Sequence, residues 1–275
     1  INYCEVGIKN IVDGGISIDG KVLTVLSERS PADLPWADLG VDVVIESTGI
    51  FTDRDKAAMH LDAGSPFVIV SAPAGGADAT FVVGVNDGDF DSSVHKVVSN
   101  ASCTTNCFVP MVQVLDQAFG VDKGLMTTIH AYTGDQSLVD GPHSDLRRAR
   151  ASAVNIIPTS TGAARATGLV LQSMNGRLDG TSLRVPIPDG SITDFTAMLK
   201  STPSVSEINS AFKEAASQGK LSGVLEYSED PLVSSDVVGN PSSCVFDAGL
   251  TMAMENLVKI SGWYDNEWGY SNRLV

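Results

Sequence analysis

The sequence predicts two folds in tandem, an α/β region followed by an α+β region whose sheet is mostly antiparallel. Before residue 100, short continuous apolar runs alternate with helical patterns, as in a parallel sheet covered by helices. After residue 103, longer strands of mixed polarity alternate with fewer helices. Between the two regions lies a nine-residue stretch, 99–107, in which hydroxyl and amide side chains surround a cysteine.

Length and composition place the chain among globular proteins and weigh against two classes of partner. Its 275 residues allow one large or two modest domains, and 43% hydrophobic residues are ample for a core. With 33 acidic and 18 basic residues, the chain lacks the basic surface that nucleic acids and anionic membranes require. No apolar run approaches a membrane span, and we find no signal-peptide pattern. Four scattered cysteines predict neither a disulfide framework nor a metal site, so we expect a cytoplasmic protein.

Turn residues and apolar runs predict the elements of the first region. A hairpin of strands 16–18 and 22–26 is expected around Asp19-Gly20. A helix capped by Thr52 is expected over residues 53–63, with Gly64 as its stop. Further strands, the first two buried on both faces, are expected over residues 43–45, 67–70, 81–83 and 97–98. This alternation is typical of a Rossmann-like half that lacks its first units, and we find no G-x-G-x-x-G loop.

The nonapeptide 99–107 supplies the candidate nucleophile. A helix with a buried face is expected to follow it and to end at Gly120. Cys103 at this strand-to-helix corner would face unpaired N–H groups and the positive end of the helix dipole, which favour a thiolate. A strand over residues 125–132 carries His130 near its end, where the imidazole could face Cys103 as a base. Spacing alone also allows Cys103 to be a buried small hydrophobe.

The second region contains further elements and several polar residues without catalytic context. Its other expected strands and helices span residues 181–185, 191–199 and 258–264, and residues 162–171 and 204–216. The last helix opens with the capping box Ser204-x-x-Glu207. Its buried residues are expected to be Val205, Ile208 and Phe212. Structural roles are expected for Cys107, His60, His95 and His143.

The motifs resemble those of phosphorylating glyceraldehyde-3-phosphate dehydrogenases. The match runs in family order through the nonapeptide and through segments 130–133, 155–158, 161–164, 184–186 and 263–270. The family's opening βαβ unit with its glycine-rich phosphate loop has no counterpart here, and the chain stops as the family's last helix would begin. We therefore expect a fragment. Its parts would be an incomplete NAD-binding domain (1–102), a catalytic domain (103–265) and the start of a C-terminal return to the NAD-binding domain (266–275).

The resemblance implies a reaction and a set of substrate-binding residues. D-glyceraldehyde 3-phosphate would be oxidised with NAD and inorganic phosphate to 1,3-bisphosphoglycerate, through a Cys103 thiohemiacetal and thioester with His130 as general base. Thr133 and Arg184 would bind the substrate phosphate, with Asp135 aligning Arg184. The remaining substrate-binding residues would be Ser102, Thr104, Arg148, Thr161 and Gly162, all but Thr104 serving the inorganic phosphate. Arg147 and Arg150 are the alternatives to Arg148.

The resemblance also implies a cofactor and an assembly. The residues that match its dinucleotide contacts are Arg29, Thr48, Ser71 and Asn266. The loop Asp140-Gly141-Pro142 resembles that of members that use NAD rather than NADP. Family members are typically cytoplasmic homotetramers of glycolysis. Three alternatives stay open: an erythrose-4-phosphate dehydrogenase, a cysteine hydrolase that uses Cys103 and His130 without cofactor, and an inactive fragment.

Overall fold

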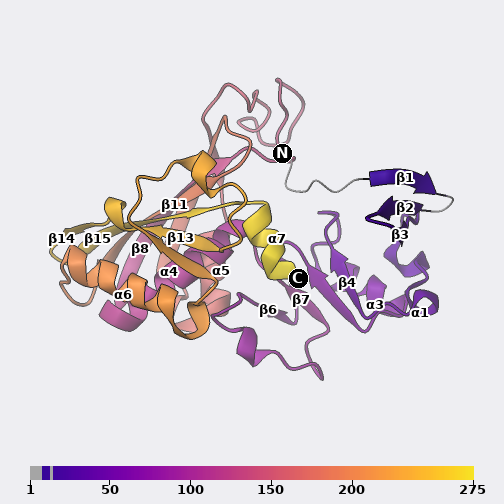
Figure 1. Cartoon of the computed structure of the whole chain (residues 1–275), viewed down its shortest axis with the longest axis horizontal. Coiled ribbons are helices and arrows are strands. Elements are labelled where there is room, and N and C mark those ends of the chain that lie inside the picture. Colours follow the sequence, from indigo (N-terminus) through magenta and orange to yellow (C-terminus); the bar gives the residue numbers. More distant parts are fainter. Residues whose placement is uncertain (1–7, 13–14) are drawn as a thin grey trace.

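Two main sheets divide the chain into two regions, which the computed structural model describes over residues 8–12 and 15–275 (Figure 1). Residues 43–99 form a four-stranded parallel sheet, and residues 121–264 form an eight-stranded mixed sheet. A small three-stranded antiparallel sheet precedes both. The predicted succession of an α/β region and an α+β region is therefore confirmed. None of the described helices is long and apolar enough to cross a membrane.

The small sheet contains the hairpin that the sequence predicts. Its strands are β1 (Ile8–Val12), β2 (Gly15–Ile18) and β3 (Lys21–Thr24). Asp19 and Gly20 join β2 to β3 with φ angles of 48° and 81°. Two consecutive residues with positive φ are what a tight type I′ hairpin turn requires. All four residues of β3 are exposed.

The parallel sheet has the strand order β4-β5-β7-β6. Its strands are β4 (Val43–Glu46), β5 (Phe67–Val70), β6 (Ala79–Thr80) and β7 (Val97–Ser99). The prediction that β4 is buried on both faces is wrong, because β4 is an edge strand whose Val43 and Ile45 are 46% and 43% exposed. The strand predicted over residues 81–83 is also wrong. Asn86 Oδ1 accepts the Val82 N–H at 2.9 Å and bends the chain into a turn there.

Short helices connect these strands. They are η1 (Pro31–Asp33), α1 (Trp36–Leu39), α2 (Arg54–Ala57), α3 (Met59–Asp62) and η2 (Asp87–Asp89). The single helix predicted over residues 53–63 is divided at Ala58, which ends α2 and begins α3. Its cap is Asp53 rather than Thr52, because the Asp53 carboxylate accepts the Asp55 N–H at 3.1 Å. Gly64 ends α3 as predicted, with φ +103°.

The larger sheet has the order β12-β13-β15-β11-β8-β10-β9, with β14 beside β15. Its strands are β8 (Val121–Ala131), β9 (Ile157–Ser160), β10 (Leu178–Val185), β11 (Ser191–Leu199), β12 (Leu225–Ser228), β13 (Cys244–Asp247), β14 (Met252–Met254) and β15 (Leu257–Tyr264). Most neighbours are antiparallel, but β8 with β10 and β12 with β13 are parallel pairs.

Helices cover one face of this sheet and enclose the main core. They are α4 (Cys103–Phe119), α5 (Ala163–Val170) and α6 (Val205–Ser217), with the short turns η3 (Gln172–Met174), η4 (Gly219–Leu221), η5 (Ser234–Val237) and η6 (Ala248–Leu250). Phe108 of α4 packs edge-on against Phe195 of β11, with 4.8 Å between ring centroids. The capping box of Ser204 and Glu207 is confirmed. Val205 is more exposed than predicted, because it is the first residue of α6 beside an exposed cap.

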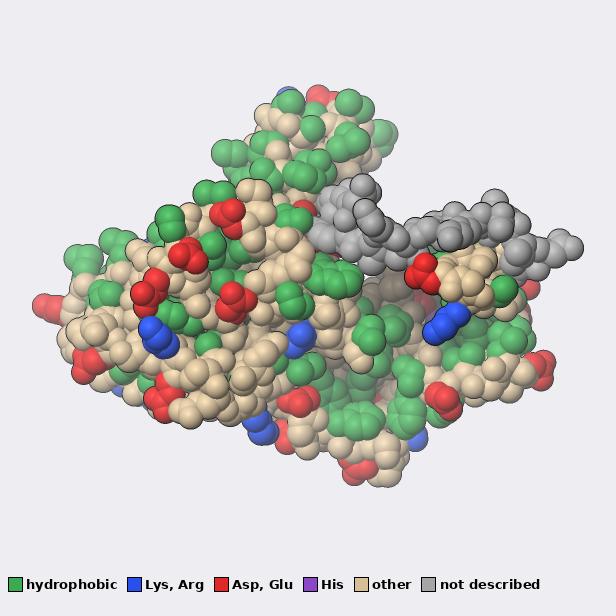
Figure 2. Space-filling model, in the orientation of Figure 1, with side chains coloured by type: hydrophobic (Ala, Val, Ile, Leu, Met, Phe, Trp, Pro, Cys, Tyr) green, Lys and Arg blue, Asp and Glu red, His purple; other side chains and the backbone are tan. Residues whose placement is uncertain are grey.

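The last helix, α7 (Trp268–Leu274), connects the two regions. It follows β15 and lies between the two sheets in Figure 1. The Tyr270 hydroxyl donates to the Ala101 carbonyl at 3.1 Å, directly before α4. Arg273 lines a hollow of about 500 Å³ on one face of the parallel sheet. Figure 2 shows hydrophobic side chains gathered over this sheet, so one of its faces is largely uncovered.

Candidate active site

Cys103 is the first residue of α4 and lies at the corner where the two regions meet. The chain leaves β7 at Ser99, passes through Ala101 with φ 57°, and begins α4 after Ser102. Ser102 caps the helix, because its Oγ accepts the Thr105 N–H at 3.1 Å. The sequence therefore placed Cys103 correctly at a strand-to-helix corner. The structure also shows that the Ser102 hydroxyl caps α4.

The structure brings Cys103 and His130 together. Cys103 Sγ lies 3.4 Å from His130 Nε2, within hydrogen-bonding distance for sulfur. His130 is buried near the end of β8, on the face of the strand that points toward the helices, together with Met126 and Thr128. A cysteine and a histidine 27 positions apart thus form a nucleophile–base geometry.

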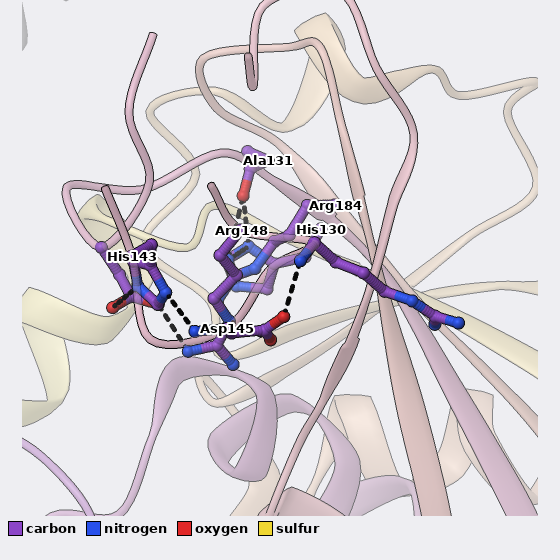
Figure 3. A network of polar contacts seen from close by, with 8 residues as sticks. His130, Ala131, His143, Asp145, Arg148 and Arg184 are labelled. Atoms are coloured by element: carbon purple, nitrogen blue, oxygen red, sulfur yellow. Dashed lines mark hydrogen bonds and ion pairs between the residues drawn. The ribbon is translucent and has the colours of Figure 1, made fainter. Parts of the chain in front are cut away.

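Arg184 occupies the other side of the His130 ring. Strands β8 and β10 run parallel in a register that sets Arg184 beside His130. Arg184 Nη1 lies 2.6 Å from His130 Nδ1 and 3.0 Å from the Ala131 carbonyl. Figure 3 shows His130, Ala131 and Arg184 together. Because arginine has only donors, Nδ1 must accept, and the ring proton is then on Nε2, facing the sulfur. The Ala131 carbonyl lies 2.7 Å from Nδ1 and is the alternative partner of that nitrogen.

Burial and Arg184 together set the protonation of this pair. Burial raises the pKa of the Cys103 thiol to about 11, although Arg184 and the Thr104 N–H act in the opposite direction. Burial and the Arg184 charge lower the pKa of His130 to about 3. Both groups are therefore neutral near pH 7. Burial of the thiol therefore outweighs the N–H groups at the helix end, which we expected to favour a thiolate, and the cation that faces the His130 ring is Arg184.

Tyr264 is a site residue that the sequence did not single out. Its hydroxyl is 2.8 Å from both the Thr104 and Thr128 hydroxyls, and its ring lies edge-on to His130. Tyr264 is fully buried at the end of β15. It therefore ties the start of α4 to β8. The Thr104 hydroxyl points into this buried cluster, which suits it to positioning Cys103 rather than to contact with a substrate.

The loop between β8 and β9 brings a second arginine to the site. Arg148 Nη1 makes an ion pair of 2.7 Å with Asp135, and its side chain is 21% exposed, against 64% for Arg150. The charge of Arg148 lowers the pKa of Arg184, after the larger effect of burial, so the two guanidinium groups are close neighbours. Figure 3 shows Arg148, with Asp145 and His143, in the same close-up as Arg184. Asp135 thus pairs with Arg148, not with Arg184 as expected.

The two arginines leave hydrogen-bond donors available for anions. The Nε groups of Arg148 and Arg184 are buried, and neither makes a hydrogen bond within the described part of the chain. Arg148 Nε does lie 3.5 Å from Asp145 Oδ2 in an ion pair, so Arg184 Nε is the one without an acceptor nearby. A buried guanidinium N–H without an acceptor is costly, and phosphate oxygens would satisfy it in the geometry that arginine favours. This cluster therefore has the chemistry of an anion site.

The remaining substrate candidates lie at loop and helix ends. Thr133 follows β8 and is half-buried. Gly162 is the exposed N-cap of α5, and the Thr161 hydroxyl accepts the Ala163 N–H at 3.2 Å. The strand register sets Ile157 opposite Arg184. Thr161 follows the far end of β9, about 13 Å along the strand from that pairing.

Two cofactor candidates lie at the edge of the parallel sheet that leads to Cys103. Thr48 follows β4 and Ser71 follows β5, just as Cys103 follows β7. The Thr48 N–H donates to the buried Glu46 carboxylate at 2.8 Å, and its hydroxyl does so as well. Arg29 lies exposed in the loop after β3. The carboxyl edge of a parallel sheet is where ligands bind in such folds, so the location of Thr48 and Ser71 fits a dinucleotide.

Asn266 is connected to β8, the strand that carries His130, through one serine. Its Oδ1 accepts the Ser191 hydroxyl at 2.7 Å, and Ser191 Oγ accepts the Ala131 N–H at 3.1 Å. Among the described residues, the hydrogen bond recorded for the Asn266 amide nitrogen is a long one of 3.4 Å to Glu267. An amide group held beside His130 with N–H capacity to spare fits the carboxamide of a nicotinamide.

The other cysteine and histidine candidates have structural partners. Cys107 is buried against Met111 and the Gly262 carbonyl. His60 is bonded to both Glu46 and Trp36. The ring nitrogens of His95 and His143 accept backbone N–H groups.

Comparisons with known proteins agree with this geometry. Residues 102–266 match the family described as "Glyceraldehyde 3-phosphate dehydrogenase, C-terminal domain", and residues 4–54 match "Glyceraldehyde 3-phosphate dehydrogenase, NAD binding domain". Glyceraldehyde-3-phosphate dehydrogenase 2 of Streptomyces avermitilis is 60% identical over 94% of this chain and 78% of the relative. The corresponding enzyme of Mycobacterium tuberculosis is 58% identical over 99% of this chain and 79% of the relative.

Proposed function

Because the chain belongs to the glyceraldehyde 3-phosphate dehydrogenase family, we propose that Cys103 is its nucleophile and His130 its general base. The protein is an NAD-dependent oxidoreductase that acts on an aldehyde group in glycolysis. The observation that carries the assignment is the 3.4 Å contact between Cys103 Sγ and His130 Nε2. The proposed domain boundaries are 1–102, 103–265 and 266–275, which is consistent with α4 beginning at Cys103 and β15 ending at Tyr264.

Substrate binding to Arg184 prepares His130 to accept a proton. When the substrate phosphate draws Arg184 away from Nδ1, that nitrogen can carry the ring proton and donate it to the Ala131 carbonyl, 2.7 Å away. Nε2 is then free to accept the Cys103 proton as the sulfur adds to the aldehyde carbon. The phosphorylated aldehyde thus activates its own nucleophile.

The proton on His130 then moves twice. It passes to the aldehyde oxygen to give the thiohemiacetal hydroxyl, and it returns to Nε2 when the carbon is oxidised to the thioester. Bound NAD supplies the hydride acceptor for that oxidation. Inorganic phosphate attacks the thioester carbon, the bond from carbon to Sγ breaks, and the acyl phosphate leaves. Tyr264 and Thr104 hold the two reacting side chains in position throughout.

The two phosphates are divided between two arginines. Arg184 and Thr133 bind the substrate phosphate, and Arg148, with Ser102, Thr161 and Gly162, binds the attacking phosphate. The buried Nε of Arg184, which makes no hydrogen bond within the described part of the chain, supports the first role, and the low exposure of Arg148 compared with Arg150 supports the second. The substrate is D-glyceraldehyde 3-phosphate, which the names of the curated relatives favour over erythrose 4-phosphate.

The cofactor lies along the carboxyl edge of the parallel sheet. Asn266 orients the nicotinamide amide, and Thr48, Ser71 and Arg29 lie along the rest of the dinucleotide. The network from Asn266 through Ser191 to Ala131 supports the first role, since it fixes Asn266 relative to His130.

We further propose a cytoplasmic homotetramer. Large aliphatic side chains of the loop between β8 and β9 are mostly exposed, with Val139 at 74% and Leu146 at 82%. Leu125, Met198 and Leu257 are exposed on the larger sheet as well. Several large apolar side chains exposed on one loop and on one sheet support contacts between subunits.

Product formation by the purified protein tests this function. We expect NADH to form only when glyceraldehyde 3-phosphate, NAD and inorganic phosphate are all present. Preference for erythrose 4-phosphate would identify the alternative dehydrogenase. Ester or amide hydrolysis without NAD would identify a cysteine hydrolase, and no activity with intact dinucleotide binding would contradict the assignment of Cys103 and His130.

A further inference from the structure

Two buried carboxyl groups lie together beside the active site, and the reaction does not use them. Asp189 precedes β11 and Asp265 follows β15, and they are 4% and 1% exposed. The antiparallel register of the two strands pairs Ser191 with Tyr264, which brings the two carboxyl groups side by side. The Asp265 carboxyl group acts on Asp189 through its charge and as a side-chain hydrogen-bond partner, and both effects raise the pKa of Asp189.

The hydrogen bonds of the pair determine which residue carries a proton. Asp265 accepts three backbone N–H groups, from Glu267 and Trp268 on one oxygen and from Gly239 on the other. Asp189 Oδ1 accepts the Gly190 N–H, but Oδ2 is buried without a donor in the described part of the chain. Two carboxyl groups can form a hydrogen bond with each other only if one of them is protonated and donates. Asp189 Oδ2 is the oxygen that lacks a donor, so the proton belongs there.

The charged surroundings favour this protonated form. Burial raises the pKa of Asp189 to about 7 against the effect of the Gly190 N–H, and the negative charges of Asp265 and Glu267 add to the shift. The turn η5 packs against Gly190 and contributes Asp236, whose carboxylate accepts the Val233 N–H. No lysine or arginine of the described residues makes an ion pair with Asp189 or Asp265.

This pair is adjacent to the residues that hold Asn266. Ser191 lies two positions after Asp189, and Asn266 directly follows Asp265. The Ser191 hydroxyl donates to Asn266, and Ser191 accepts the N–H of the residue after His130. Separation of the two carboxyl groups would therefore move the contact between Ser191 and Asn266.

We propose that Asp189 and Asp265 share one proton, and that this acid–carboxylate hydrogen bond positions Asn266 for the cofactor. Asp189 and Asp265 are positioning residues, since neither touches a reacting atom. This inference rests on the proposed role of Asn266 in orienting the nicotinamide. Loss of the proton leaves two adjacent negative charges, which repel each other and loosen the end of β15 from the start of β11.

The shared proton makes the stability of the fold depend on pH in a defined direction. Folded Asp189 keeps its proton where an aspartate in the unfolded chain, with a pKa of about 3.9, has lost it. The folded state then binds more protons than the unfolded state. Its contribution to stability falls as pH rises from about 4 to about 7 and stays at the lower level above that range.

The first experiment compares Asp189→Asn with the unchanged protein in the absence of any ligand. The amide can donate the same hydrogen bond to Asp265 but does not titrate. We expect the folding equilibrium of the unchanged protein, relative to Asp189→Asn, to fall about tenfold per pH unit within that window. Exposed Asp230→Asn serves as the matched control and should follow the unchanged protein. Parallel profiles for Asp189→Asn and the unchanged protein would overturn the shared proton.

The second experiment measures NAD affinity by calorimetry at pH 6 and pH 8.5. We expect the unchanged protein to bind several-fold more weakly at the higher pH, and Asp189→Asn to bind equally at both. Asp189→Ala should bind weakly at both, with a raised KM for NAD and a smaller change in kcat. Normal affinity of Asp189→Ala would overturn the positioning role. Failure of the proposed reaction would leave the ligand-free stability comparison intact, so the two failures can be told apart.

Discussion

Each of the two regions buries a histidine, and the two histidines differ in what surrounds them. In the parallel-sheet region, His60 lies between Glu46 and Trp36, with a donor on one ring nitrogen and an acceptor at the other. In the region of the larger sheet, His130 lies between Arg184 and the thiol of Cys103. Burial of a histidine therefore does not distinguish a structural role from a catalytic one. What distinguishes His130 from His60 is its neighbour, the thiol of Cys103, which lies at the corner where α4 begins.

The two sheets differ in the same sense. The larger sheet has a continuous core under α4 and α6, in which Phe195 and Phe212 are fully buried. The parallel sheet has a much smaller core and an uncovered apolar face, visible in Figure 2. The groups to which we assign bond-making thus lie on the region with the larger core. The cofactor candidates Thr48 and Ser71 lie at strand ends of the less covered sheet.

The largest effect is expected at the nucleophile. Cys103→Ser should reduce phosphate-dependent NADH formation on the order of 10⁴-fold or more, because a serine hydroxyl is a far weaker nucleophile near neutral pH. Steady-state assays at saturating substrate measure this change. Cys107→Ala, one helical turn away, should keep turnover within a few-fold per folded molecule. Equal losses of activity in both variants would contradict the assignment of Cys103 as the nucleophile.

The next effect separates the two buried histidines. His130→Asn should slow hydride transfer by about 10² to 10⁴-fold, the usual contribution of a positioned acid–base group. His60→Asn should lower the midpoint of thermal unfolding but leave kcat per folded molecule unchanged. Stopped-flow absorbance of NADH, together with calorimetry, measures both. If His60→Asn lowered kcat as much as His130→Asn, the contrast between the two regions would be wrong.

Stability should separate the two sheets. Phe195→Ala removes a fully buried ring and should cost about 3–5 kcal/mol in the free energy of unfolding. Ile45→Ala, on the exposed face of β4, should cost less than about 1 kcal/mol. Denaturant unfolding followed by tryptophan fluorescence measures both values. A large loss from Ile45→Ala would show that this face is covered in solution.

Smaller effects are expected from the arginines. Arg184→Leu should shift the pH profile of Cys103 alkylation upward, because its cation opposes the rise in the pKa of the thiol, whereas His130→Asn should shift it less. Arg148→Leu should raise the KM for inorganic phosphate by about 10- to 100-fold with an intact acylation burst. Exposed Arg150→Leu is the matched control. If Arg150→Leu gave the phosphate phenotype instead, Arg148 would be the wrong choice.

The sequence predicted the four longest strands of the larger sheet, β8, β10, β11 and β15, because their patterns are long. It missed the short strands β9, β12, β13 and β14, which have three or four residues each. Strand β11 has the predicted bounds of 191–199, and the capping box at Ser204 begins α6 as predicted. The nonapeptide and the strand that carries His130 predicted the pair of side chains that the structure brings within 3.4 Å of each other. In the parallel-sheet region, the run Val43–Ile45 predicted burial on both faces, but strand composition does not reveal which neighbours cover a sheet.

Features that depend on strand register were beyond the sequence. The contact of Arg184 with His130 arises because β8 and β10 pair in one particular register. Likewise, Asp189 meets Asp265 only because β11 and β15 are antiparallel neighbours. The protonation of Cys103 also depends on burial, which raises the pKa of the thiol by more than the Thr104 N–H at the helix end lowers it.

The most direct test of the central claim is the acyl-enzyme itself. The protein is mixed with NAD and glyceraldehyde 3-phosphate without inorganic phosphate, quenched in acid, and digested for mass spectrometry. We expect a burst of one NADH per site and an acyl group on Cys103 alone, which added phosphate removes from the unquenched enzyme. An adduct on Cys107, or full turnover without any adduct on Cys103, would contradict the account.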